Sequence, residues 1–242
     1  MMRRYLLAAI LLSVAVSSPA VTTNDAVTAE TQGRELAQQL RNLQPPEGFT
    51  NSATLQIRGK GRRADIPLTA LTSVSETNWQ TTYIAQTTNG LAYLSVRHLA
   101  GQPNGYHLDP GCSDSEAARA RLMSPFAGSD FWVVDLALDF LHWPAQKVWR
   151  KELKKGQSCA VLESRLAAPA TNGYSRVVSW VDIDTGGIVQ AEAYDAKGKL
   201  LKEFEVKELE KINGRLEVTE IQMRNVQTGS RTTLRFNFAP SK

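Results

Sequence analysis

Hydrophobic and polar residues alternate in short runs over the last quarter of the chain, from residue 176 to residue 238. The runs have the length of ordinary strands, about five to eight residues, and they are separated by turn sequences such as Asp195-Ala-Lys-Gly198, Asn213-Gly214 and Thr228-Gly229. Gly and Asn are favoured in such turns because they tolerate a positive φ. Strands joined by so few residues pair antiparallel, since a parallel return requires a long crossover. The pattern therefore predicts an antiparallel meander.

A second set of alternating runs occupies the first half of the chain. In the run 51–58, Ala53, Leu55 and Ile57 alternate with polar residues, which is typical of a strand with one dry face. We expect about ten to twelve strands in all, in a mainly β (α+β) fold with two or three inserted helices. The further runs of this kind span residues 66–75, 79–86, 91–99, 148–153 and 159–166.

Two segments show helical rather than strand periodicity. In residues 28–43, Leu36, Leu40 and Leu43 recur at helical spacing opposite a polar face, and a pair of prolines follows them. This pattern predicts an amphipathic helix that ends before the prolines. A shorter helix is expected over residues 114–123.

The segment Ser129–Trp143 differs from both patterns, because ten of its fifteen residues are apolar and occupy nearly every helical face. Ser129 or Asp130 can cap a helix here, and Pro144 ends it. Such a helix must be covered on most sides, whereas each predicted strand has only one dry face. A single helix against the concave face of a curved sheet satisfies both requirements. If it fills the hollow incompletely, an apolar pocket remains.

Large apolar residues of the strands and of this segment would line the pocket. Core packing accounts for any one of them, but their distribution over both meanders and the central segment favours a lined cavity. The candidate lipid-cavity residues are Leu55, Ile57, Trp79, Tyr83, Tyr93, Phe131, Trp132, Leu136, Phe140 and Trp180.

The N-terminus has the pattern of a secretory signal peptide. Two arginines precede a short apolar run, which ends at the small residues Ser18-Pro19-Ala20. The run is shorter than the ~20 residues that span a bilayer, although an uncleaved anchor is the alternative. No cysteine follows it to accept a lipid. We expect residues 1–20 to be a signal peptide and residues 21–242 to form a single exported domain.

Cys112 and Cys159 are the two cysteines of the chain. In an oxidising compartment such a pair often forms a disulfide. Each can equally be a small buried hydrophobic residue, and the sequence leaves both interpretations open.

The charge pattern excludes a nucleic-acid partner. The net charge is only +4, and basic residues are mixed with acidic ones instead of forming a patch. The densest basic run, Lys147–Lys155, is interpreted as a strand with a solvated face. A contact with anionic lipid headgroups or with a partner is the alternative.

No constellation of catalytic or metal-binding residues rises above background. The three histidines have no ligand spacing, and no nucleophile motif or phosphate-binding loop is present. Asp135, Asp139 and His142 share one helical face, but such a face more often meets solvent or arginine than a metal. We expect no metal, no cofactor and no enzymatic activity.

Several short motifs resemble the outer-membrane lipoprotein-sorting (LolA-like) family, in its uncharacterised branch. The similarity covers residues 48–238 and is densest after Gly128. The motifs are Gly128-Ser-Asp-Phe131, Cys159-Ala-Val-Leu162, Val178-Ser-Trp-Val-Asp182, Ala193-Tyr-Asp-Ala-Lys-Gly-Lys199 and Met223-Arg-Asn225 with Thr228-Gly229.

The resemblance implies a half-open, curved antiparallel β-barrel with an inserted helical lid over an apolar cavity. It implies a periplasmic carrier that binds the acyl chains of lipoproteins or other lipids and transfers them towards the outer membrane. An inner-membrane donor complex and an outer-membrane receptor are the implied partners. The alternative function is an envelope lipid-sensing or protein-binding module without a transport role. Known carriers pin the lid with an arginine inside the barrel, for which Arg58 and Arg97 are the candidates.

Overall fold

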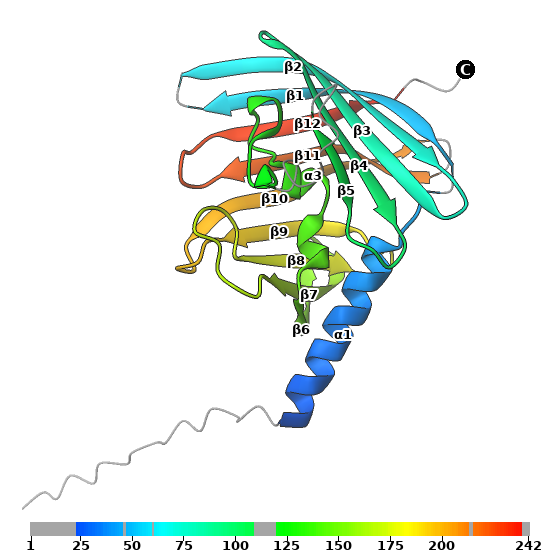
Figure 1. The fold of residues 1–242 in the computed structure, drawn as a ribbon, viewed down its shortest axis with the longest axis vertical. Helices are drawn as coiled ribbons and strands as arrows, with labels where there is room; N and C mark the ends of the chain where they lie inside the picture. The colour runs from blue at the N-terminus through cyan, green and yellow to red at the C-terminus, as the bar shows by residue number, and fades with distance from the viewer. Residues whose placement is uncertain (1–22, 46, 60, 109–119, 213–214, 239–242) are drawn as a thin grey trace, which may run out of the picture.

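One twelve-stranded antiparallel sheet forms the body of the protein (Figure 1). The computed structural model describes residues 23–45, 47–59, 61–108, 120–212 and 215–238. The strands are β1 Phe49–Gly59, β2 Arg62–Val74, β3 Asn78–Thr87, β4 Gly90–Leu99, β5 Gly105–Leu108, β6 Ala145–Lys154, β7 Gln157–Arg165, β8 Arg176–Asp182, β9 Ile188–Tyr194, β10 Leu200–Ile212, β11 Arg215–Asn225 and β12 Arg231–Asn237.

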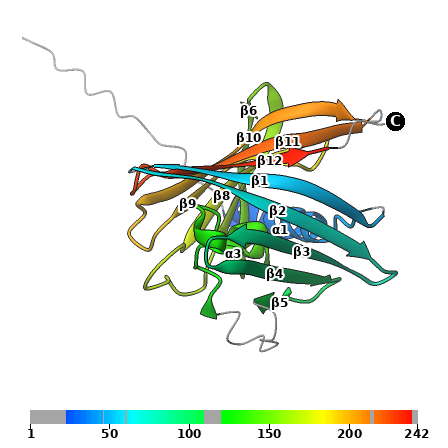
Figure 2. The same ribbon diagram turned by 90° about the horizontal axis from the view of Figure 1, so that it is seen from above.

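The sheet consists of two meanders joined at one seam, as the alternation predicts. The strand order is β5-β4-β3-β2-β1-β12-β11-β10-β9-β8-β7-β6, so β1 and β12 are the only neighbours distant in sequence. Leu55 of β1 lies opposite Leu234 of β12 at this seam. The sheet curves until β3–β5 face β8–β10 across a hollow (Figures 1 and 2). The predicted fold class and strand number are confirmed.

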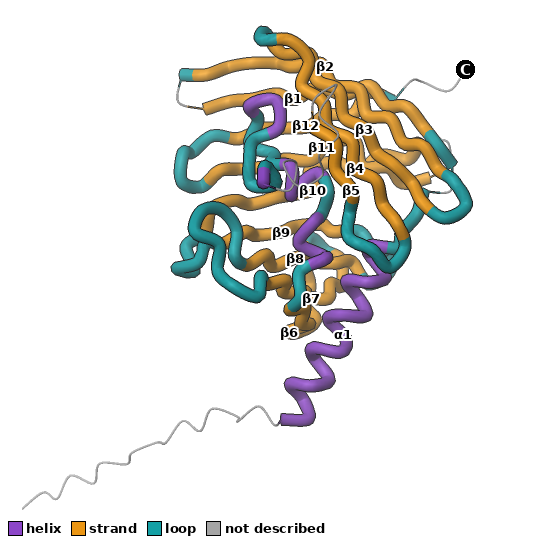
Figure 3. Tube along the Cα trace, in the orientation of Figure 1, coloured by secondary structure: helices purple, strands orange, loops and turns teal. Residues whose placement is uncertain are grey.

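The predicted helix over residues 129–143 is broken. The segment Phe126–Trp143, named here the inserted segment, contains η1 Phe126–Gly128, α3 Val133–Leu136 and η2 Asp139–His142 (Figure 3). Leu138 separates α3 from η2 in the left-handed conformation, at φ 49° and ψ 37°, which a residue with a branched side chain rarely adopts. The break turns the chain between Leu136 and Asp139.

Two apolar clusters on the concave face meet at the inserted segment. Phe131 and Val133 pack into the first cluster, with residues of β1–β5, β11 and β12. Val134 and Phe140 pack into the second, with residues of α1 and β7–β9. The segment therefore connects the two halves of the core, and Figure 2 shows α3 enclosed between them.

A third apolar cluster lies on the outer face of β7 and β8, and the sequence analysis did not anticipate it. Cys159, Val161, Val178 and Trp180 form this outer cluster. Long side chains cover it: the Lys154 ammonium lies 4.3 Å from the centroid of the Trp180 ring. β7 and β8 are consequently buried on both faces, which corrects the expectation of one dry face for every strand.

Helix α1, Thr23–Arg41, crosses β6 and closes one end of the hollow (Figure 1). It confirms the predicted amphipathic helix and begins five residues earlier. Its approach to β6 is close, because a Cβ atom at Gly33 would lie 2.4 Å from the backbone nitrogen of Lys147. The predicted signal peptide lies outside the described residues, as does most of the predicted helix 114–123. In the described part of the chain, no helix has both the length and the apolar character needed to cross a membrane.

We expect Gly33→Ala to lower the free energy of unfolding in urea denaturation. An alanine inside a helix is normally more stable than glycine by about 1 kcal/mol. Here the added methyl group would meet the backbone of β6, and such overpacking costs about 1–3 kcal/mol. The exposed Gln38→Ala serves as the control and should change stability by less than about 0.5 kcal/mol. A stabilised Gly33→Ala variant would contradict the close packing of α1 on β6.

Candidate functional site

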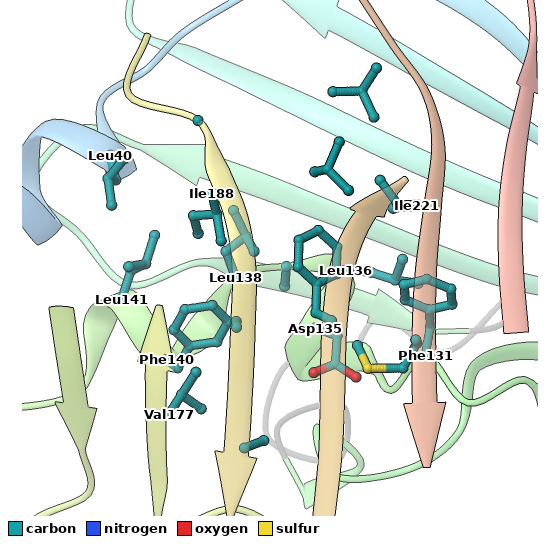
Figure 4. A pocket seen from close by; sticks show the side chains of 18 of the residues that line it. Leu40, Phe131, Asp135, Leu136, Leu138, Phe140, Leu141, Val177, Ile188 and Ile221 are labelled. Atoms are coloured by element: carbon teal, nitrogen blue, oxygen red, sulfur yellow. The ribbon is translucent and has the colours of Figure 1, made fainter. Parts of the chain in front are cut away.

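An apolar cavity of about 480 Å³ lies between the inserted segment and the concave face of the sheet. Its walls come from β8–β12, from β3 and β4, from the end of α1 and from the segment itself. Figure 4 shows Leu40, Leu141 and Ile188 on one side of it and Phe131 on the other, with Asp135 between them. The volume falls in the range of ligand pockets, about 300–1,000 Å³.

The cavity reaches the surface beside the end of α1. Leu43 and Leu138 both line it and are 57% and 42% exposed. Gly187, in the turn between β8 and β9, is also exposed and lines the cavity. These three residues mark the mouth.

Five of the ten predicted cavity residues line the cavity, and three more lie close to its walls. The five are Trp79, Tyr83, Phe131, Leu136 and Phe140. Leu55 and Ile57 are buried in the first cluster behind the wall. Trp132 stacks on Tyr174, with ring centroids 4.8 Å apart, and so supports the segment without lining the cavity.

Tyr93 and Trp180 lie on the opposite face of the sheet, which corrects their assignment to the cavity. Tyr93 packs against His107, and strand alternation places it opposite the buried Leu94. Trp180 belongs to the outer cluster. Alternation could not assign Trp180 to a face because β8 is buried on both sides.

A buried lysine holds the inserted segment against the sheet. The side chain of Lys202 is 1% exposed, and its ammonium donates a hydrogen bond to the Asp130 carbonyl oxygen at 2.5 Å. It also lies 3.6 Å from Asp135 Oδ2 and 3.7 Å from the centroid of the Trp132 ring. The Asp130 carboxylate in turn accepts hydrogen bonds from Ser230 and Thr232. The start of the segment is thereby bound to β10 and to the beginning of β12.

Burial opposes the charges of this group. Burial lowers the pKa of Lys202 to about 8, although the nearby Asp135 favours the charged form. Burial also raises the pKa of the Asp135 carboxyl, which Lys202 and the hydrogen bonds from Trp132 and Tyr174 counteract. Removal of either Lys202 or Asp135 would therefore leave an uncompensated charge in the interior.

Side chains from many elements bind the remaining carbonyl groups of the inserted segment. Short helices leave most of their carbonyl groups without an internal partner. The donor and acceptor pairs are Arg62 to Gly128 at 3.0 Å, Tyr83 to Leu136 at 3.4 Å, Asn104 to Ala137 at 3.1 Å, Gln146 to Phe140 at 3.0 Å and to Trp143 at 2.9 Å, and Arg41 to Leu141 at 2.6 Å.

Sequence reasoning missed Lys202, and neither predicted pinning arginine enters the cavity. Arg58 pairs with Asp65 at the edge of the β1–β2 hairpin, and Arg97 is exposed on β4. The available signal was the alternation in β10, where Lys202 is in phase with Phe204 and Val206, which both line the cavity. A lysine at such a position predicts a buried partner.

Cys159 is a free, buried thiol in the outer cluster. Its Sγ atom lies 3.6 Å from the Gln157 carbonyl oxygen, and burial raises the pKa of the thiol. Cys159 is thus buried, and Cys112, its possible disulfide partner, lies outside the described residues.

The polar face of the predicted helix is divided among different partners. Asp135 faces Lys202, whereas Asp139 accepts a hydrogen bond from Tyr106. Among the described residues, no three His, Cys, Asp or Glu side chains gather as a metal site. The basic run Lys147–Lys155 lies largely in β6, as predicted, and its Lys155 pairs with Glu205.

The family model that matches the chain covers residues 81–239 and describes uncharacterised proteins. The chain belongs to this family. Its fold is that of the LolA superfamily, as solved structures show. A protein described as an outer membrane lipoprotein-sorting domain, from Vibrio parahaemolyticus, matches with a TM-score of 0.67 and 20% identity, over 86% of this chain and 92% of that chain.

Two further solved structures share the LolA-like fold. A DUF1329 family protein from Desulfovibrio piger has a TM-score of 0.65 and 19% identity, over 86% of this chain and 91% of that chain. A LolA superfamily protein from Nitrosomonas europaea has a TM-score of 0.58 and 17% identity, over 88% of this chain and 94% of that chain. The search of curated proteins finds no match.

We expect Lys202→Met to lower the free energy of unfolding by about 3–5 kcal/mol, because it leaves the buried Asp135 without its counter-ion. The double variant Lys202→Met/Asp135→Asn should lose less free energy of unfolding than the two single variants lose together. Urea denaturation of the four proteins measures this coupling. Lys199→Met, in the exposed turn before β10, is the control. Strict additivity would contradict the pairing.

His98 should make the protein less stable as the pH falls from about 6.5 to 4. Burial against Trp79 lowers the pKa of His98 to about 4, so the unfolded chain takes up this proton at a higher pH than the folded one. Stability falls wherever the unfolded state binds more protons on acidification. Denaturation at several pH values should show that the stability of His98→Gln falls less over this pH range than that of the unchanged protein. The same pH dependence in both proteins would contradict a buried neutral His98.

Proposed function

We propose that the protein is a periplasmic carrier that binds the acyl chain of a lipid or lipoprotein in this cavity and moves it towards the outer membrane. The observation that carries the proposal is the apolar cavity itself, enclosed by the curved sheet and the inserted segment and open beside α1. The LolA-like fold supports the proposal, since one of its members is described as a lipoprotein-sorting domain.

The size of the cavity suits one long acyl chain. A group of the size of a water molecule or a methylene occupies about 30 Å³, so 480 Å³ holds roughly 16 such groups. Burying each methylene contributes about 0.8 kcal/mol. A chain that is only half inserted would thus gain about 6 kcal/mol before the cost of association is subtracted.

The polar groups of the cavity support binding without chemistry. Lys202, Asp135 and Tyr174 bind one another and the inserted segment, so they are engaged in structural contacts. We propose that the protein transfers its ligand unchanged between membranes, from a donor to a receptor that accept the same acyl chain.

Export is part of the proposal. Residues 1–20 would direct the chain out of the cytoplasm and be removed, and residues 21–242 would act as one periplasmic domain. Mass spectrometry of the protein purified from the cell envelope tests this step through the mass of its N-terminus. A mature chain that still begins with Met1 would contradict it.

Ile188→Glu should abolish binding of a fluorescent fatty acid while the protein stays folded. Ile188 is a half-buried residue of the cavity wall, and a carboxylate there would lie against the acyl chain. The matched control is Val189→Glu, because Val189 is the next residue of β9, is also half-buried, and packs against the outer cluster. Fluorescence titration gives the affinity, and thermal denaturation checks the fold of both variants.

The proposed carrier function predicts that Val189→Glu binds the probe as the unchanged protein does. Equal binding by both variants would place the ligand outside the cavity. A failure of the unchanged protein to bind any long-chain probe would contradict the carrier function itself.

A further inference from the structure

We propose that the cavity takes an amphiphile with an anionic head group, a carboxylate or a phosphate, and that Arg41 at the mouth binds this group. The inference rests on the proposed binding of an acyl chain and narrows it to one chemical class of lipid. It concerns the polar end of the ligand, which the apolar walls cannot select.

Arg41 stands where a head group would lie. It is the last residue of α1, it is half-buried, and it lines the cavity together with Leu40 and the exposed Leu43. Figure 4 shows Leu40 close to Leu141 at one side of the cavity, and the carbonyl oxygen of Leu141 accepts the hydrogen bond from Arg41. A chain that extends inward from this side would leave its head group beside the guanidinium.

The guanidinium retains donors after its structural contact is made. One nitrogen, Nη1, binds the Leu141 carbonyl oxygen at 2.6 Å. A guanidinium carries five N–H donors in a planar fork, which matches the two oxygens of a carboxylate or phosphate. The negative end of the α1 dipole also favours a cation at this position, and this interaction leaves the N–H donors available.

Arg41 has no carboxylate partner in the described part of the chain. None of the ion pairs among the described residues includes it. Asp135, the one carboxylate among the described lining residues, faces Lys202 instead. Partial burial lowers the pKa of Arg41, because it disfavours the charged form. An anionic ligand would supply a counter-ion.

The other basic groups of the lining are less suited to this role. Lys202 is enclosed by Asp130, Asp135 and Trp132. His98 stacks on Trp79, and burial lowers its pKa to about 4, so it is neutral at physiological pH. Of the arginine and lysine side chains in the described lining, Arg41 is therefore the one that a ligand can reach.

The test compares two probes that share one acyl chain, palmitate with its carboxylate and neutral 1-monopalmitoylglycerol. Arg41→Gln should weaken palmitate binding by about 10- to 100-fold, which is the effect of losing a hydrogen-bonded charge partner. The affinity for monopalmitoylglycerol should change by less than about twofold. Arg34→Gln, on the exposed side of α1, is the matched control and should change neither affinity. Isothermal titration calorimetry gives all the constants.

A second arm distinguishes a lipid head group from a free anion. Acetate and inorganic phosphate, which have no acyl chain, should not displace palmitate at millimolar concentration; displacement would overturn the assignment to an amphiphile. Equal effects of Arg41→Gln on both lipids, or no effect on either, would overturn the role of Arg41 while leaving acyl-chain binding intact. If neither lipid binds the unchanged protein, the proposed function and this inference both fail.

Discussion

The ammonium group of Lys202 is enclosed between the Asp130 carbonyl group, the Asp135 carboxylate and the face of Trp132. It lies on β10 and reaches the inserted segment, so it holds that segment between the two halves of the curved sheet. A buried charge is tolerated only with partners in good geometry, which makes this contact specific in a way that apolar packing alone is not. The cavity exists because the segment is held there and leaves part of the hollow unfilled.

The backbone of the inserted segment imposes the second constraint. Several of its carbonyl groups are buried, such as those of Ala137, Phe140 and Trp143, and each buried one without a partner would cost about 1–3 kcal/mol. Side chains from α1, β2, β3, β6, β10 and the β4–β5 turn meet this requirement. Polar contacts thus gather at the segment, and the wall of β9, β11 and β12 can remain apolar. An apolar wall of this kind suits a site that holds an acyl chain.

Much of the fold could be predicted from alternation, because most strands have one wet face and short turns. The break at Leu138 could not, since the backbone next to it binds donors such as Tyr83 of β3 and Asn104 of the β4–β5 turn, which are distant in sequence. Trp180 was assigned to the wrong face because β8 has no polar face to orient it. Lys202 left a signal in the alternation of β10, but the role of Arg41 depends on how α1 meets η2, which only the tertiary structure reveals.

The position of the bound acyl chain is the most direct test of the account. Two variants, each retaining a single tryptophan, would be titrated with a fatty acid brominated in mid-chain, which quenches tryptophan fluorescence on contact. Trp79 lines the cavity and Trp180 lies on the opposite face of the sheet. The account predicts strong quenching of Trp79 and little of Trp180. Quenching of Trp180, or none of Trp79 at saturating lipid, would contradict it.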